Sequence, residues 1–238
     1  CAEQAVELQD EDFGYISKDF LASKPDILGD ADLIDLLMKY AFTLPKEKDL
    51  KYFAESKSKV LRAGKYTEDD FNERLVSLAI QFALSEEVQV TDEVDFEAVK
   101  GVLDKFIPTQ SFFVFNYFKT QYFLENKEMD PALEAFNQII DNPDKVGYQQ
   151  LCNAMMGFGP ILHEAGKLDK YLEKFNAIKV PAKDADQAYL KDFVKAIIYI
   201  KTKQTDKFKE TANTMLASAS TPEDVKKDLR QALQNMGN

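Results

Sequence analysis

The sequence predicts an all-α protein made of about five antiparallel helix pairs and a final capping helix. Apolar side chains recur at the three- and four-residue spacing of an amphipathic helix through most of the 238 residues. These stretches come in pairs, joined by short polar turns that contain glycine, proline or aspartate. Strand signals are scarce. Residues 87–91 (EVQVT) alternate, and a pair of strands there would leave the predicted class unchanged.

The stretch at 110–141 shows the predicted unit most clearly. Its first half is crowded with aromatic side chains between Phe112 and Phe123, so the helix is apolar around most of its circumference and needs partners on more than one side. Asp130 and Pro131 then favour a new helix start, because a carboxylate caps the free N–H groups and proline fits the first turn. A one-sided apolar face follows, which predicts an amphipathic return helix.

The rest of the chain is divided in the same way. Residues 1–12 are interpreted as a tether, and 13–238 as a single helical-repeat domain that opens with a short helix at 13–23. The other pairs are expected at 31–43 with 46–62, 67–86 with 92–106, 146–164 with 168–178, and 184–202 with 205–217. A last helix is expected at 221–235, where Thr221 and Pro222 form a good start and Leu229 and Leu233 face inward.

An aspartate marks each second helix, at intervals of 46, 35, 39 and 37 residues. A period in the high thirties with two helices in each unit is typical of stacked helical repeats. The aspartates are Asp49, Asp95, Asp130, Asp169 and Asp206.

At these residues the chain resembles the tetratricopeptide repeat superfamily, most clearly over 110–217. Ala132 and Ala135 are small residues early in a second helix, and Gly166 occupies the turn of the fourth pair. The first two pairs fit by helix length alone. Prolines close the third and fourth units and, later than the family pattern expects, the fifth, at Pro143, Pro181 and Pro222. The resemblance implies a right-handed α-α superhelix whose first helices line a concave groove that holds peptides.

Composition argues against several partners. The formal net charge is −11, whereas nucleic acids and anionic membranes are bound through lysine and arginine. The chain starts at Cys1, followed by a polar, acidic segment, and in this it resembles a mature bacterial lipoprotein. That interpretation predicts lipidation of Cys1 and a place in the cell envelope, with contact to the membrane through the lipid alone. An arbitrary boundary at Cys1 is the alternative, and a cytoplasmic location stays open with it.

The sequence contains no catalytic motif. His163 is the single histidine, so a catalytic triad or a zinc site of several imidazoles is not expected. Gly157–Pro160 (GFGP) lacks the spacing of a phosphate loop and predicts a kink or a close helix contact. Cys152, in an apolar helix, is expected to be an inert core thiol. We therefore expect no enzyme activity, cofactor or metal, although spacing alone leaves open a site made of two separated carboxylates.

These observations predict a non-catalytic scaffold that binds a protein or peptide partner. The alternative is a helical accessory protein that holds a small ligand, such as a sugar or a peptide, in a pocket near the kink at 157–160. Packing in the core is the simpler interpretation of the aromatic cluster. The residues expected to line the concave groove are Asn116, Tyr117, Lys119, Tyr122, Tyr148, Asn153, Tyr189 and Lys195.

Overall fold

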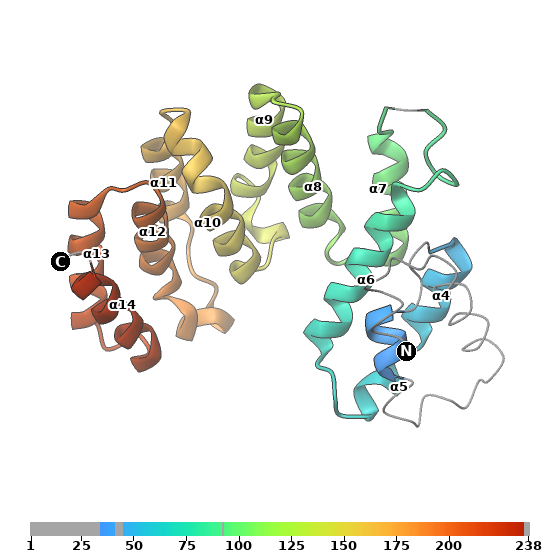
Figure 1. Ribbon diagram of the computed structural model, residues 1–238, viewed down its shortest axis with the longest axis horizontal. Coiled ribbons are helices and arrows are strands. Elements are labelled where there is room, and N and C mark those ends of the chain that lie inside the picture. The colour runs from blue at the N-terminus through green and yellow to red at the C-terminus, as the bar shows by residue number, and fades with distance from the viewer. Residues whose placement is uncertain (1–33, 41–44, 92, 236–238) are drawn as a thin grey trace. The chain divides into compact units, whose positions relative to one another are not determined.

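A computed structural model describes residues 34–40, 45–91 and 93–235 (Figure 1). Every regular element in these ranges is a helix, and the helices pack against their neighbours, so the predicted all-α class is confirmed. No helix within them is both long and apolar enough to cross a bilayer. The predicted tether at 1–12, the helix at 13–23 and Cys1 lie outside the described residues.

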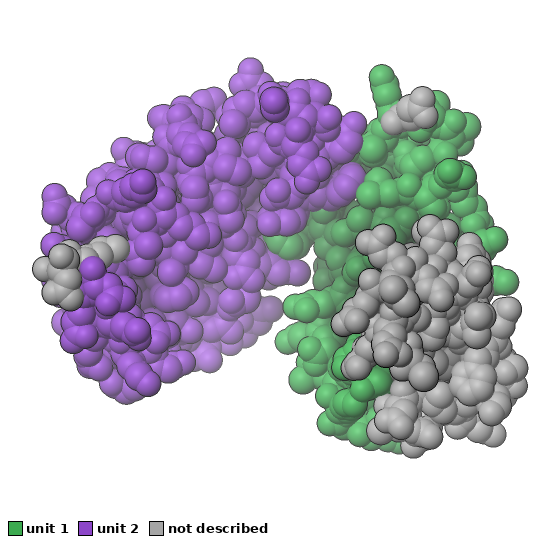
Figure 2. All heavy atoms as spheres, viewed as in Figure 1, with its two compact units in different colours: residues 1–115 green, residues 116–238 purple. Residues whose placement is uncertain are grey.

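The chain divides into two compact units, residues 1–115 and 116–238, and the division falls within helix α8 (Ser111–Glu125) (Figure 2). This division does not test the prediction of one domain over 13–238, which stays a prediction.

In the first unit, helix α4 packs against three others, and α6 packs against α7. Phe53 from α4 and Phe71 from α6 are fully buried, and their rings stack with centroids 4.6 Å apart. This pair is therefore at the centre of the unit's core. The elements are the π-helical turn η2 (Leu36–Tyr40), α4 (Glu47–Glu55), α5 (Lys57–Arg62), α6 (Glu68–Ala83) and α7 (Phe96–Phe106).

The second unit is a run of helix pairs closed by α14. Helix α10 packs against α11 and α12, α12 against α13, and α13 against α14. Leu229 is buried in the core between the last helices and Leu233 packs against it, as predicted. The elements are α9 (Met129–Ile140), η3 (Pro143–Lys145), α10 (Tyr148–Glu164), α11 (Leu168–Ala177), η4 (Ala182–Gln187), α12 (Leu190–Lys201), α13 (Thr205–Ala217) and α14 (Glu223–Asn235).

The turns that end α8, α10 and α12 have the same structure. In each, one residue adopts the left-handed backbone conformation, and the next N–H bonds to a carbonyl five residues earlier, which is the Schellman closure of a helix. The left-handed residues are Lys127, Gly166 and Lys203, with φ of 62°, 66° and 58°. They are 39 and 37 residues apart, which are the intervals between Asp130, Asp169 and Asp206. The predicted period therefore corresponds to a repeated backbone geometry.

Two predicted helices are broken. The helix expected at 46–62 is divided at Ser56, whose buried side chain donates a 2.6 Å hydrogen bond to the carbonyl of Phe53. Serine competes in this way with the helix for backbone carbonyls. The α-helix expected at 184–202 begins only at Leu190, since the preceding residues form the 3-10 segment Ala182–Gln187, in which Asp184 has a non-helical backbone.

The structure decides two smaller points. Residues 87–91, where the sequence left a pair of strands open, contain no strand, and Val90 in this loop is 94% exposed. Helix α9 begins at Met129, so that Asp130 and Pro131 lie inside its first turn instead of starting it. Acidic residues and proline are favourable throughout a first turn, which is why the sequence places this boundary only approximately.

Candidate functional site

Of the α8 residues predicted to line a groove, Lys119 and Tyr122 both contact Phe123 of the same helix. Asn116 is buried, with 6% of its surface exposed, whereas Tyr117, Lys119 and Tyr122 are half-buried. Tyr122 packs edge-on against Phe123 with ring centroids 5.5 Å apart. The Lys119 ammonium lies 5.9 Å from the centre of the same ring. Lys119 and Tyr122 therefore pack on the Phe123 ring.

The other four residues predicted to line the groove differ in exposure. Two are on α10, one directly precedes α12 and one is within α12. Tyr148 is buried, whereas Asn153 is exposed and its side-chain oxygen is 3.5 Å from the amide nitrogen of Gln149. Tyr189 is half-buried against the core of the last helices. Lys195 pairs with Asp192 at 2.6 Å. Asn153 is thus the most accessible of the eight, and a binding role for the set stays a prediction.

Helix α10 runs without a break through the glycines that were predicted to interrupt it. Gly159 is buried, and a Cβ atom there would lie 2.5 Å from Cδ1 of Ile198 in α12. Of the two interpretations of this motif, the close helix contact is therefore confirmed. The space beside Gly159 is filled by the Ile198 side chain, whereas Gly157 is exposed.

Burial controls the chemistry of Cys152. The residue is fully buried and is a free thiol. Burial raises its pKa to about 11, because the charged thiolate loses its hydration there. Cys152 is therefore a protonated, unreactive thiol at neutral pH, as predicted from its apolar helix.

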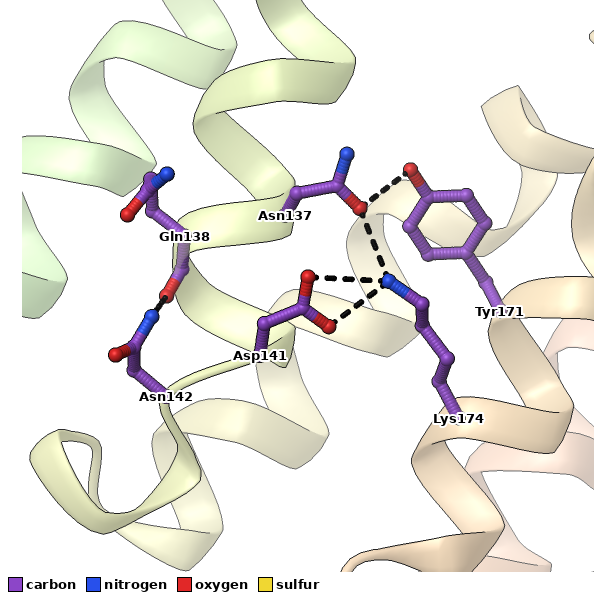
Figure 3. A network of polar contacts seen from close by, with 6 residues as sticks. All are labelled: Asn137, Gln138, Asp141, Asn142, Tyr171 and Lys174. Atoms are coloured by element: carbon purple, nitrogen blue, oxygen red, sulfur yellow. Dashed lines mark hydrogen bonds and ion pairs between the residues drawn. The ribbon is translucent and has the colours of Figure 1, made fainter.

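A polar network links α9 to α11, which belongs to the next helix pair along the chain (Figure 3). The Tyr171 hydroxyl donates a 2.9 Å hydrogen bond to Oδ1 of Asn137. The Lys174 ammonium donates to both carboxylate oxygens of Asp141, at 2.8 and 3.1 Å, and approaches Oδ1 of Asn137 at 3.5 Å. These partners are 33 to 37 residues apart in sequence, which is the separation expected for neighbouring repeats.

The network fixes the orientation of the Asn137 side chain. A lysine ammonium can only donate hydrogen bonds, so the amide oxygen, rather than the nitrogen, must face Lys174. Burial raises the pKa of Tyr171, so its hydroxyl stays protonated and donates to the same oxygen. The Asn137 NH₂ group is turned away from Lys174 in Figure 3 and donates to no atom of the described residues. It is therefore an oriented and available hydrogen-bond donor.

Beside this network is an open groove of about 350 Å³ between α9 and α11. Its floor is formed by Leu133, Asn137 and Tyr171, and the two apolar members are buried. The Tyr171 ring also packs on Phe136, with centroids 5.7 Å apart, so core contacts hold the floor in place.

The two walls of the groove carry opposite charges. Asp130 and Glu134 project from the α9 side, and Lys167 and Lys170 from the α11 side. All four are exposed, and none of them forms an ion pair with any residue that the structure describes. The arrangement can contact positive groups along one side and negative groups along the other, above a surface that offers an amide donor.

This groove was not predicted from the sequence. The available signal was the repetition of charge at the repeat period, since acids on α9 are followed 33 to 37 residues later by lysines on α11. That pattern becomes meaningful only when the two helices are known to be neighbours.

Comparison of the chain with family models, with curated proteins and with solved structures found no significant match.

Proposed function

We propose that this chain is a non-catalytic helical-repeat scaffold of the tetratricopeptide type, and that it holds an extended segment of a partner protein in the groove between α9 and α11. The repeated turns after α8, α10 and α12 support the repeat architecture, because equivalent hairpins one period apart are what such a stack requires.

One observation carries the choice of site: Asn137, whose amide is oriented by Tyr171 and Lys174, lines the same groove as acids on the α9 side and lysines on the α11 side. These four charged residues form no ion pair with any described residue. An extended peptide offers backbone carbonyls, which an amide donor can bind, and side chains on both sides, which charged walls can contact. A groove of about 350 Å³ is near the lower end of the range for ligand sites, so it fits a few residues of a peptide.

A matched pair of variants tests this proposal. Peptides that bind the full chain are selected from a random library, and their affinities are measured for Asn137→Asp and for Asn153→Asp. Both changes add one negative charge and remove one side-chain amide, but the first is in the groove and the second is on the exposed face of α10.

We expect Asn137→Asp to weaken binding about tenfold, the effect of losing one good hydrogen bond and exposing the peptide carbonyl to a carboxylate. Asn153→Asp should change affinity less than about twofold. If Asn153→Asp weakens binding and Asn137→Asp does not, the groove is the wrong site and the predicted face of the first helices is favoured instead. If neither variant matters, the proposed site is wrong as well.

A further inference from the structure

The charges on the two walls of the α9–α11 groove indicate what kind of segment it binds. We propose that the segment carries alternating basic and acidic side chains, with its basic residues toward Asp130 and Glu134 and its acidic residues toward Lys167 and Lys170. This inference rests on the proposed function, because it assumes that the groove holds an extended peptide.

Spacing along α9 supports the pattern. Asp130 and Glu134 are four residues apart, which places their backbones about 6 Å apart along the helix axis. In an extended chain, side chains two residues apart point to the same side and are separated by about 6.6 Å. Two basic residues at alternate positions therefore match the two carboxylates. The residues between them point to the opposite side, toward the lysines.

The lysines of α11 are also placed to meet acidic groups. One turn further along the groove, Lys174 reaches Asp141 of α9 at 2.8 Å. The corresponding contact is not made at Lys167, although Glu134 lies 33 residues before it, the same separation as in the paired residues. Lys170 likewise forms no ion pair with a described residue. The Lys174–Asp141 ion pair thus joins the two sides at one end of the groove. Beside the floor, the acidic and basic side chains of the two walls are not paired with each other.

The floor supplies a contact that is independent of side-chain charge. The Asn137 NH₂ group is held in place by Tyr171 and Lys174, which both bond to its oxygen (Figure 3). It can donate to a backbone carbonyl of the bound segment, which would fix the segment's register along the groove. A bound segment with a fixed register presents each side chain to a fixed wall, so the groove can distinguish alternating charges from the same charges in another order.

Two labelled peptides of about eight residues and identical composition test this inference. One alternates lysine and glutamate, and the other carries all its lysines before its glutamates; both have blocked termini. Binding to the full chain is measured by fluorescence anisotropy at low salt and at about 0.15 M salt, because exposed charge contacts are screened over about 8 Å at the higher value.

We expect the alternating peptide to bind at least about tenfold more tightly than the block peptide. Glu134→Gln and Lys170→Gln should each remove most of this difference. Glu210→Gln, which removes an exposed carboxylate from α13, should leave it unchanged.

Equal binding of the two peptides, or a difference that Glu134→Gln and Lys170→Gln leave intact, would overturn the inference. So would the absence of binding by both. In each of these cases the library peptides are measured again with Asn137→Asp. If they still lose affinity, the charge pattern is wrong and the proposed function stands; if they do not, the groove fails as a peptide site altogether.

Discussion

The contact between α10 and α12 predicts that two glycines in one helix respond in opposite ways to the same substitution. In Gly159→Ala, the new Cβ would be placed 2.5 Å from Cδ1 and 2.6 Å from Cγ1 of Ile198. Ile198 is fully buried, so α10 and α12 must move apart or its side chain must leave its rotamer. Overpacking of this kind costs about 1–3 kcal/mol. Alanine recovers about 1 kcal/mol through its higher helix propensity.

We therefore expect Gly159→Ala to lower the free energy of unfolding by up to about 2 kcal/mol. Gly157→Ala is the matched control, because Gly157 is exposed and its nearest neighbour, the Tyr117 hydroxyl, would lie at an ordinary 3.6 Å from the new Cβ. This change should raise the free energy of unfolding by up to about 1 kcal/mol. Equilibrium urea unfolding followed by far-ultraviolet circular dichroism measures both values.

A double-mutant cycle shows whether the effect comes from this contact. Ile198→Ala alone should cost about 2–5 kcal/mol, and it should cost clearly less in the Gly159→Ala background, where the methyl group fills part of the space. A stabilising effect of Gly159→Ala equal to that of Gly157→Ala would refute the close approach of α10 and α12.

Two further predictions concern the turns and the buried thiol. Lys127→Gly should raise the free energy of unfolding by about 0.5–1 kcal/mol, because it removes a side chain from a left-handed position. Gly166→Ala, in the equivalent turn, should lower it by about 1 kcal/mol. Urea unfolding measures both changes, and if both variants are stabilised or both destabilised, the two turns are not equivalent. Cys152 has a pKa raised by burial to about 11, so between about pH 7 and 9 its thiolate fraction is far smaller than that of an exposed thiol. Its alkylation in the folded protein, followed by peptide mass spectrometry, should therefore be much slower at each pH in this range than in the urea-unfolded chain. Since the unfolded thiol ionises first, near pH 9, stability should fall as the pH rises from 9 to about 11. Rapid labelling of Cys152 without unfolding would contradict its burial.

Much of the second unit follows from local patterns in the sequence. The apolar faces with a period of 3.6 residues predict the helices. The aspartates at 130, 169 and 206 predict hairpins, and in the structure equivalent turns join the two helices of each hairpin. Local signals are enough here because helices and their closing turns are formed by residues close in sequence.

The candidate site could not be predicted in the same way. Helix α8 is apolar on nearly every side, so its sequence does not show which side faces outward, and Asn116 proved to be buried. The Asn137–Tyr171 hydrogen bond joins two helix pairs across 34 residues of sequence, and neither residue belongs to a motif. Such a site depends on which helices become neighbours and on their register, and both are set by packing along the whole stack.

The side-chain amide signal of Asn137 tests the central claim most directly. In a ¹⁵N–¹H spectrum of the full chain, this NH₂ pair is identified by its loss in Asn137→Asp, and the peptide that binds most tightly is then added. We predict that the Asn137 signal shifts downfield with the same saturation curve as binding, as expected when the amide donates to a carbonyl of the peptide. A saturating peptide that leaves this signal unmoved while shifting that of Asn153 would contradict the groove as the binding site.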